Sequence, residues 1–168
     1  MRVNNFPHYK QRDHKDCGPT CLKIIAKHYN KTIHLEQLRE LSETSRVGSS
    51  LLGLSEAAEN LGFRSLGIKV SLNRLLHTPL PCILHWNKNH YVVLYTIKKD
   101  VFYISDPAHG LLKYTKDDIS AVAKDILATN PDIICLQEVG IKENWTNKKE
   151  VGKKMADALW SATIVDRK

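Results

Sequence analysis

The sequence lacks any apolar run long enough to cross a membrane, since no stretch approaches the ~18 uncharged apolar residues that a spanning helix needs. Residues 1–15 are polar and contain no apolar core segment, so no secretory signal is predicted. We therefore expect that this chain alone neither crosses nor enters a membrane. Internal repeats and low-complexity stretches are also lacking. With 168 residues, 42% hydrophobic and 26% charged, the composition predicts a folded globular protein and excludes disorder as its main state.

Charge of one sign is nowhere concentrated, because no run of five like charges occurs. The net charge is nevertheless +7, and it is uneven: residues 1–110 carry 15 Lys and Arg against 9 Asp and Glu, whereas residues 111–168 carry 10 against 9. A basic half can attract nucleic acid, acidic lipid or an acidic peptide. A solvated surface explains the same pattern, and we predict no nucleic-acid partner.

Cysteine is present but not in the pattern of a disulfide framework. Cys17 and Cys21 would lie one turn apart on one helix, and Cys82 and Cys135 lie in apolar, strand-like runs. These positions favour free thiols in a reducing cytoplasm.

Hydrophobic spacing predicts an α+β layout, with helices first and an antiparallel sheet after them. The C-terminal part changes to a βα-type rhythm, so we expect a domain over residues 1–115 and a non-catalytic extension over residues 116–168. Helices are predicted at residues 17–29, 34–41 and 51–61, a helical turn at 72–76, and strands at 63–70, 82–86, 91–97, 101–105 and 111–114. In the extension, helices are predicted at residues 115–128 and 148–159, and strands at 132–137 and 162–165.

Cys17 is the most informative residue because it opens a predicted helix. The positive end of the helix dipole favours the thiolate form of such a cysteine, which makes it a candidate nucleophile. Gly18 removes a side chain where a substrate backbone would approach, and Asp16 precedes the thiol; both are predicted to contact substrate. A small buried core cysteine is the alternative interpretation.

Gln11 lies six residues before Cys17 in a polar segment. Its side-chain amide could donate a hydrogen bond to the oxyanion that forms when a carbonyl is attacked. An exposed surface glutamine would show the same spacing.

His90 and Asp106 are expected to meet at one edge of a β-hairpin. The turn at residues 98–100 would pair residue 97 with 101 and residue 92 with 106. Because side chains alternate along a strand, His90 shares the face of Val92 and becomes a diagonal neighbour of Asp106. A carboxylate there would orient the imidazole as a general base. An ordinary surface His and Asp flanking a hairpin is the alternative.

Metal binding is a rival use of the same residue types. Cys17 and Cys21, followed by His85 and His90, faintly resemble a zinc pattern. His85 and His90 are five residues apart in an extended chain and would face opposite sides, so no metal or other cofactor is predicted.

The segment Gln11-Arg-Asp-His-Lys-Asp-Cys-Gly-Pro-Thr-Cys-Leu22 resembles the active-site signature of the bacteriocin-processing cysteine peptidases, papain-like domains usually fused to peptidase-containing ABC transporters. The resemblance covers roughly residues 5–115. It continues through Gly48-Ser-Ser-Leu-Leu-Gly-Leu54, Glu59-Asn-Leu-Gly-Phe63, Pro81-Cys-Ile-Leu-His-Trp86, His90-Tyr-Val-Val93 and Asp106-Pro107.

By this resemblance Cys17 is the nucleophile, His90 the general base and acid, Asp106 the orienting residue and Gln11 the oxyanion donor. The family cleaves leader peptides after a Gly-Gly or Gly-Ala pair on the cytosolic side, before export, without a metal or nucleotide. The implied partners are the leader of a secreted peptide precursor and a membrane ABC transporter, acting in trans or in a longer parent protein. A leader-binding domain that does not cleave remains the alternative.

The end of the chain departs from that family. Residues 126–139 resemble the metal-binding strand of the endonuclease/exonuclease/phosphatase family, which would make Glu138 a magnesium ligand. A single carboxylate cannot assemble hydrolytic metal chemistry, so we expect a plain βα unit there.

Overall fold

A computed structural model describes residues 5–86, 89–119 and 132–138 of the chain, the last range for its backbone only. Its elements are a short 3-10 helix η2 (His14–Asp16), helices α1 (Cys17–His28), α2 (Leu35–Leu41), α3 (Leu51–Asn60) and α4 (Leu72–Leu75), and strands β1 (Phe63–Lys69), β2 (Cys82–Trp86), β3 (His90–Lys98), β4 (Val101–Asp106), β5 (Gly110–Thr115) and β6 (Asp132–Glu138). The predicted α+β layout is confirmed. The helix predicted at residues 148–159 and the strand at 162–165 lie outside the described residues.

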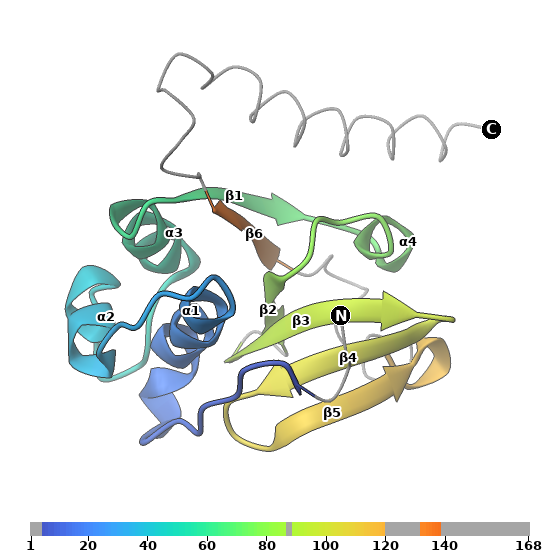
Figure 1. The fold of residues 1–168 in the computed structure, drawn as a ribbon, viewed down its shortest axis with the longest axis horizontal. Helices are drawn as coiled ribbons and strands as arrows, with labels where there is room; N and C mark the ends of the chain where they lie inside the picture. The colour runs from blue at the N-terminus through green and yellow to red at the C-terminus, as the bar shows by residue number, and fades with distance from the viewer. Residues whose placement is uncertain (1–4, 87–88, 120–131, 139–168) are drawn as a thin grey trace, which may run out of the picture.

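The strands form one antiparallel sheet in the order β1-β6-β2-β3-β4-β5. α1 packs against β3, and α3 packs against β1 (Figure 1). Alternation along the strands separates two buried clusters, one on each face of the sheet. Ile83, Tyr91, Val93 and Tyr95 join the cluster with α1 and α3, whereas Cys82, Leu84, Val92 and Leu94 join the cluster with α4.

The β3–β4 hairpin contains a bulge that corrects its register. At the turn Lys98 pairs with Val101, one residue away from the predicted pairing. The register then shifts between Leu94 and Thr96, so that Val93 pairs with Ser105. Beyond the bulge the strands therefore pair in the predicted register, in which residue 92 would be opposite residue 106. A bulge re-aims the side chains that follow it, and here it places Asp106 on the face that His90 occupies.

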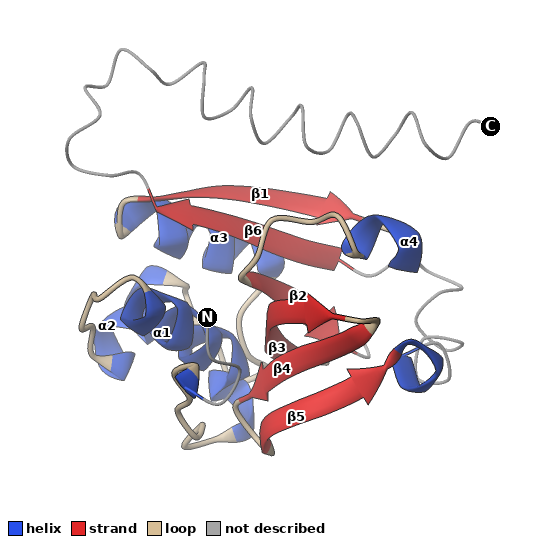
Figure 2. Ribbon diagram, turned by 45° about the vertical axis from the view of Figure 1, so that its right-hand side comes forward, coloured by secondary structure: helices blue, strands red, loops and turns tan. Residues whose placement is uncertain are grey.

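The predicted boundary after residue 115 does not divide the described residues into two units. β6 comes from the predicted extension, yet it lies between β1 and β2, as Figure 2 shows for β1 and β6. Ile134 is opposite Gly67 on one side and Ile83 on the other. An apolar strand with two pairing edges satisfies its backbone groups inside a sheet, and for that reason this segment belongs to the sheet and is no separate appendage.

A close approach between helices shapes the loop before α3. The side chain of Ser50 caps α3 by accepting a hydrogen bond from the backbone N–H of Gly53 at 3.0 Å. A Cβ at Gly53 would lie 2.6 Å from the backbone oxygen of Ser42, so only glycine allows this approach. The hydroxyl of Tyr91 donates to the Ser49 carbonyl at 3.2 Å and ties the loop to β3.

Candidate active site

Cys17 begins α1 and lines a cavity of about 890 Å³ between the helices and the sheet. Its side chain is buried, but the cavity reaches it. Residues from four separate parts of the chain surround this space. The lining residues are Gln11, His14, Cys17, Arg46, Val47, Gly48, Ser49, Ser50, Leu51, His85, Asn89, His90, Tyr91, Ala108 and His109.

His90 lines this cavity and is in direct contact with Asp106, which is not among the lining residues. The Nε2 atom of His90 lies 2.8 Å from the Oδ1 atom of Asp106. β3 supplies the histidine with its first residue, and β4 supplies the aspartate with its last. The diagonal contact predicted from strand alternation is therefore present in the structure. Since Nε2 is held by Asp106, Nδ1 is the ring nitrogen that remains for proton transfer.

Asp106 is held as a carboxylate by three donors. His90 approaches Oδ1, the backbone N–H of Ala108 donates to Oδ1 at 2.8 Å, and the Nδ1 atom of His109 lies 2.8 Å from Oδ2. Burial by itself would raise the pKa of Asp106, but the hydrogen bonds with His90, His109 and Ala108 outweigh it and hold the pKa well below its usual range. Asp106 therefore stays charged throughout the neutral pH range.

The imidazole of His90 is shifted toward its charged form. Burial opposes that charge, yet hydrogen bonding with Asp106 and Cys17 and the attraction of their negative charges raise the pKa of His90 to about 9. A protonated imidazole beside the thiol stabilises the thiolate in return. The three side chains can thus form an imidazolium–thiolate pair backed by a carboxylate.

Gln11 reaches the same cavity from the N-terminal segment. Its backbone N–H donates to the carbonyl of Pro107 at 2.9 Å, which ties this segment to the loop after Asp106. Its side-chain oxygen is buried and finds no hydrogen-bond partner among the residues that the structure describes. Gln11 therefore lines the same cavity as Cys17, and its side-chain oxygen is an unused hydrogen-bond acceptor.

Gly18 and Asp16, for which substrate contacts are predicted, are not among the residues that line the cavity. A Cβ at Gly18 would lie 3.0 Å from two methyl groups of Leu54, so this glycine permits α1 to pack on α3. Asp16 is fully buried and forms an ion pair with Arg39. Gly18 is therefore packed against α3, and the Asp16 side chain is directed to Arg39 of α2.

The zinc pattern suggested by the cysteines is not assembled. Cys21 is fully buried, and burial raises the pKa of its thiol, which disfavours the thiolate that a metal needs. Among the described residues, His90, Asp106 and His109 do bring three possible ligand atoms within 4.8 Å of one another. Hydrogen bonds to Asp106 already occupy these atoms, and we assign no metal there.

Sequence reasoning missed several residues around the site. His109 follows Asp106 by three residues in a tight turn, and this spacing was a usable signal for a shared carboxylate. Arg39 gave no signal, because nothing in its own neighbourhood points to a carboxylate 23 residues earlier. The segment from Arg46 to Leu51 also lines the cavity, although the sequence analysis assigns no site residue to it.

Comparison with known proteins agrees with this geometry. The sequence profile of the peptidase C39 family matches residues 5–128. The chain is 39% identical over 116 residues to the lactococcin-G-processing and transport ATP-binding protein LagD of Lactococcus lactis subsp. lactis. It is 34% identical over 114 residues to the colicin V secretion/processing ATP-binding protein CvaB of Escherichia coli. These matches cover 66% and 68% of this chain and 16% of each relative, so the chain spans a small part of those proteins.

Solved structures show the same fold. One is a double glycine motif protease from an AMS/PCAT transporter in complex with the leader peptide, with a TM-score of 0.69 and 31% identity over 79% of this chain and 91% of that chain. Another is the peptidase domain of Streptococcus ComA, with a TM-score of 0.68 and 28% identity over 80% of this chain and 100% of that chain. The predicted papain-like cysteine peptidase fold is confirmed. No helix within the described ranges has the length and apolar character needed to cross a membrane.

Proposed function

The chain belongs to the peptidase C39 family, and we propose that it is a cysteine endopeptidase that removes the leader of a secreted peptide precursor by cutting after a Gly-Gly type site. The observation that carries the proposal is that Cys17 and His90 line one cavity, while Asp106 lies 2.8 Å from the Nε2 atom of His90. The double glycine motif protease solved with its leader peptide supports the choice of substrate.

In the acylation step, the Cys17 thiolate attacks the carbonyl carbon at the end of the leader, and a C–S bond forms. The negative charge moves to the carbonyl oxygen, where the backbone N–H of Cys17 and the side-chain amide of Gln11 act as donors. The His90 imidazolium gives its proton to the departing amine nitrogen as the C–N bond breaks. A thioester and the freed mature peptide result.

In the deacylation step, neutral His90 takes a proton from a water molecule, whose oxygen attacks the thioester carbon. The C–S bond breaks, the leader leaves with a carboxylic acid end, and the thiolate–imidazolium pair is restored. Asp106 keeps the His90 ring in one orientation and stabilises its charge during both steps.

The relatives are transport and processing proteins that are far longer than this chain. We therefore propose an ABC transporter as the partner, in the same parent protein or as a separate chain, with cleavage on the cytosolic side of the membrane.

The proposal is tested by incubating the chain with a synthetic precursor that contains a Gly-Gly site and measuring product masses. The expected products are the leader ending in the second glycine and the remaining peptide. Cys17→Ala should abolish cleavage while leader binding, followed by fluorescence anisotropy, stays within about twofold. If the wild-type chain binds the leader without cutting it, the alternative function of a leader-binding domain replaces this one.

A further inference from the structure

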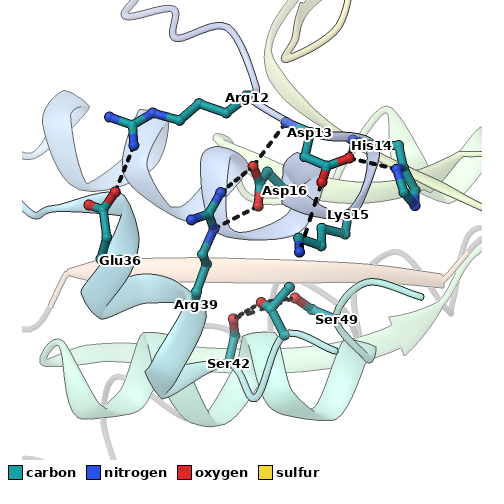
Figure 3. Close-up of polar contacts among 10 residues, drawn as sticks. Arg12, Asp13, His14, Lys15, Asp16, Glu36, Arg39, Ser42 and Ser49 are labelled. Carbon is teal, nitrogen blue, oxygen red and sulfur yellow. Dashed lines mark hydrogen bonds and ion pairs between the residues drawn. The ribbon is translucent and has the colours of Figure 1, made fainter. Parts of the chain in front are cut away.

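Asp16, the residue directly before the nucleophile, carries a buried charge that the proposed mechanism does not use. Its side chain has no exposed surface, and its two oxygens accept three hydrogen bonds. Arg39 of α2 donates from Nε to Oδ1 at 2.8 Å and from Nη2 to Oδ2 at 2.6 Å (Figure 3). The backbone N–H of Asp13 donates to Oδ2 at 3.0 Å. This bidentate geometry, with two guanidinium N–H groups on the two carboxylate oxygens, is the strongest form of carboxylate–guanidinium contact.

The pair fixes the segment that carries both the nucleophile and the oxyanion donor. Asp16 is the last residue of η2 and stands between Gln11 and Cys17 in the chain. Its carboxylate does not cap α1, although it stands at the N-cap position. The carboxylate instead accepts hydrogen bonds from the backbone N–H of Asp13 and from Arg39 of α2. The contact with Asp13 completes a capping box, which holds the first and last residues of η2 in place.

The pair also decides the electrostatic field at the thiol. An unpaired carboxylate one residue away from Cys17 would repel the thiolate, and burial would strengthen that repulsion. Arg39 cancels this charge, and the hydrogen bonds that it donates to Asp16 raise the pKa of Arg39 above its ordinary value, so the guanidinium remains charged. The other titratable or charged groups around the thiol are His90 of β3, Asp106 of β4, His14 of η2, Cys21 of α1, and Arg46 and His109 from loops that line the cavity.

We propose that Asp16 and Arg39 are positioning residues for catalysis: together they orient the segment from Gln11 to Cys17, and Arg39 neutralises the carboxylate that would otherwise disfavour the Cys17 thiolate. This inference rests on the proposed peptidase function. Neither residue lines the cavity.

The chain offers a matched control that joins the same two segments. Arg12, next to Gln11, contacts Glu36 of α2 at 2.7 Å, but the side chains are 69% and 56% exposed. Solvent screens such a pair. Glu36→Gln therefore removes a link of similar length and placement without leaving a buried charge.

The experiment measures two properties of each variant in the full chain. One is the pH dependence of Cys17 alkylation by iodoacetamide, located by peptide mass mapping, which requires no substrate. The other is kcat and KM for cleavage of the Gly-Gly precursor at pH 7. Circular dichroism and thermal unfolding show that each variant is folded.

Arg39→Met should raise the pH midpoint of alkylation by about one unit and lower kcat about tenfold, with KM within twofold. Asp16→Asn should move the midpoint in the opposite direction, because it leaves an unpaired guanidinium near the thiolate. The double variant Asp16→Asn/Arg39→Met should return the midpoint to the wild-type value. Arg39→Lys should leave the pH midpoint of alkylation unchanged but lower kcat, because lysine retains the positive charge but cannot form the bidentate contact. Glu36→Gln should match the wild type in both measurements.

Wild-type midpoints and kcat in folded Arg39→Met would overturn the proposal. If Arg39→Met does not fold, an unchanged or raised pH midpoint of alkylation in Asp16→Asn would likewise overturn the proposal. The two proposals fail separately: a wild-type chain that never cleaves the precursor contradicts the peptidase function, whereas unshifted alkylation midpoints contradict only the role of the pair.

Discussion

Replacing Asp106 with asparagine should move the alkaline limit of activity to lower pH. Asparagine has almost the same shape and can still accept a hydrogen bond from His90, so the change removes a charge with little change in volume. The proposed mechanism requires the His90 imidazolium when the amine departs. Activity should therefore fall on the alkaline side as that proton is lost.

The magnitude follows from the contacts of His90. Its pKa is raised from 6.5 to about 9 against the opposing effect of burial. This corresponds to a preference of about 3 kcal/mol for the charged ring, shared between the contacts with Asp106 and Cys17. If Asp106 supplies half, its loss weakens the charged form by roughly 1.5 kcal/mol, which is about tenfold in protonation equilibrium. We expect the alkaline limb of kcat/KM to move down by about one pH unit. Activity should therefore fall about fivefold at pH 9, whereas at pH 7 the ring stays mostly protonated and the loss from this cause is small.

The assay is a pH profile of kcat/KM from pH 5 to 10 with the Gly-Gly precursor as substrate. Asp100→Asn is the matched control, because it removes the same charge from the exposed turn at the far end of the same hairpin. It should leave the profile unchanged. An alkaline limb that stays in place in Asp106→Asn would refute the argument that this carboxylate holds the His90 proton.

Three further results are expected. Gln11→Ala should lower kcat about 10²-fold with little change in KM, because one oxyanion donor is lost; a wild-type kcat would remove Gln11 from that role. Gly53→Ala should lower the free energy of unfolding in urea by about 1–3 kcal/mol, since its Cβ would lie 2.6 Å from the Ser42 oxygen, whereas Gly67→Ala, with 3.8 Å to its nearest neighbour, should not; equal values for the two variants would contradict the packing argument. The raised pKa of His90 stabilises the fold fully below about pH 6.5, and this contribution is lost as the pH rises through about 9. Thermal unfolding should therefore show a larger loss between pH 6 and pH 9.5 in the wild type than in the Asp106→Asn variant, and parallel losses would contradict it.

The contact between His90 and Asp106 could be predicted because two local rules suffice for it. A short turn sets which residues face each other, and alternation sets which side chains share a face. The bulge between Leu94 and Thr96 was not predictable, because residues 91–95 are buried on both faces of the sheet and this continuous apolar run shows no alternation that an extra residue could interrupt. The predicted register was off by one at the turn, and the bulge restored it near the site.

Contacts between distant segments escaped the sequence analysis. The place of β6 between β1 and β2 depends on which buried strand pairs with which, and apolar composition does not encode that choice. Asp16 is predicted to contact substrate, and in the structure its side chain forms two hydrogen bonds with Arg39 on another helix. A charged residue next to a catalytic one can face away from the site, and only the packing of α2 decides this.

The most direct measurement is mass spectrometry of the chain quenched in acid during a single turnover with the Gly-Gly precursor. We expect a transient species heavier by the leader acyl group, with the added mass mapped to the peptide that contains Cys17. Precursor cleavage that proceeds in Cys17→Ala, or a leader attached to any other residue, would contradict the claim that this thiol is the nucleophile.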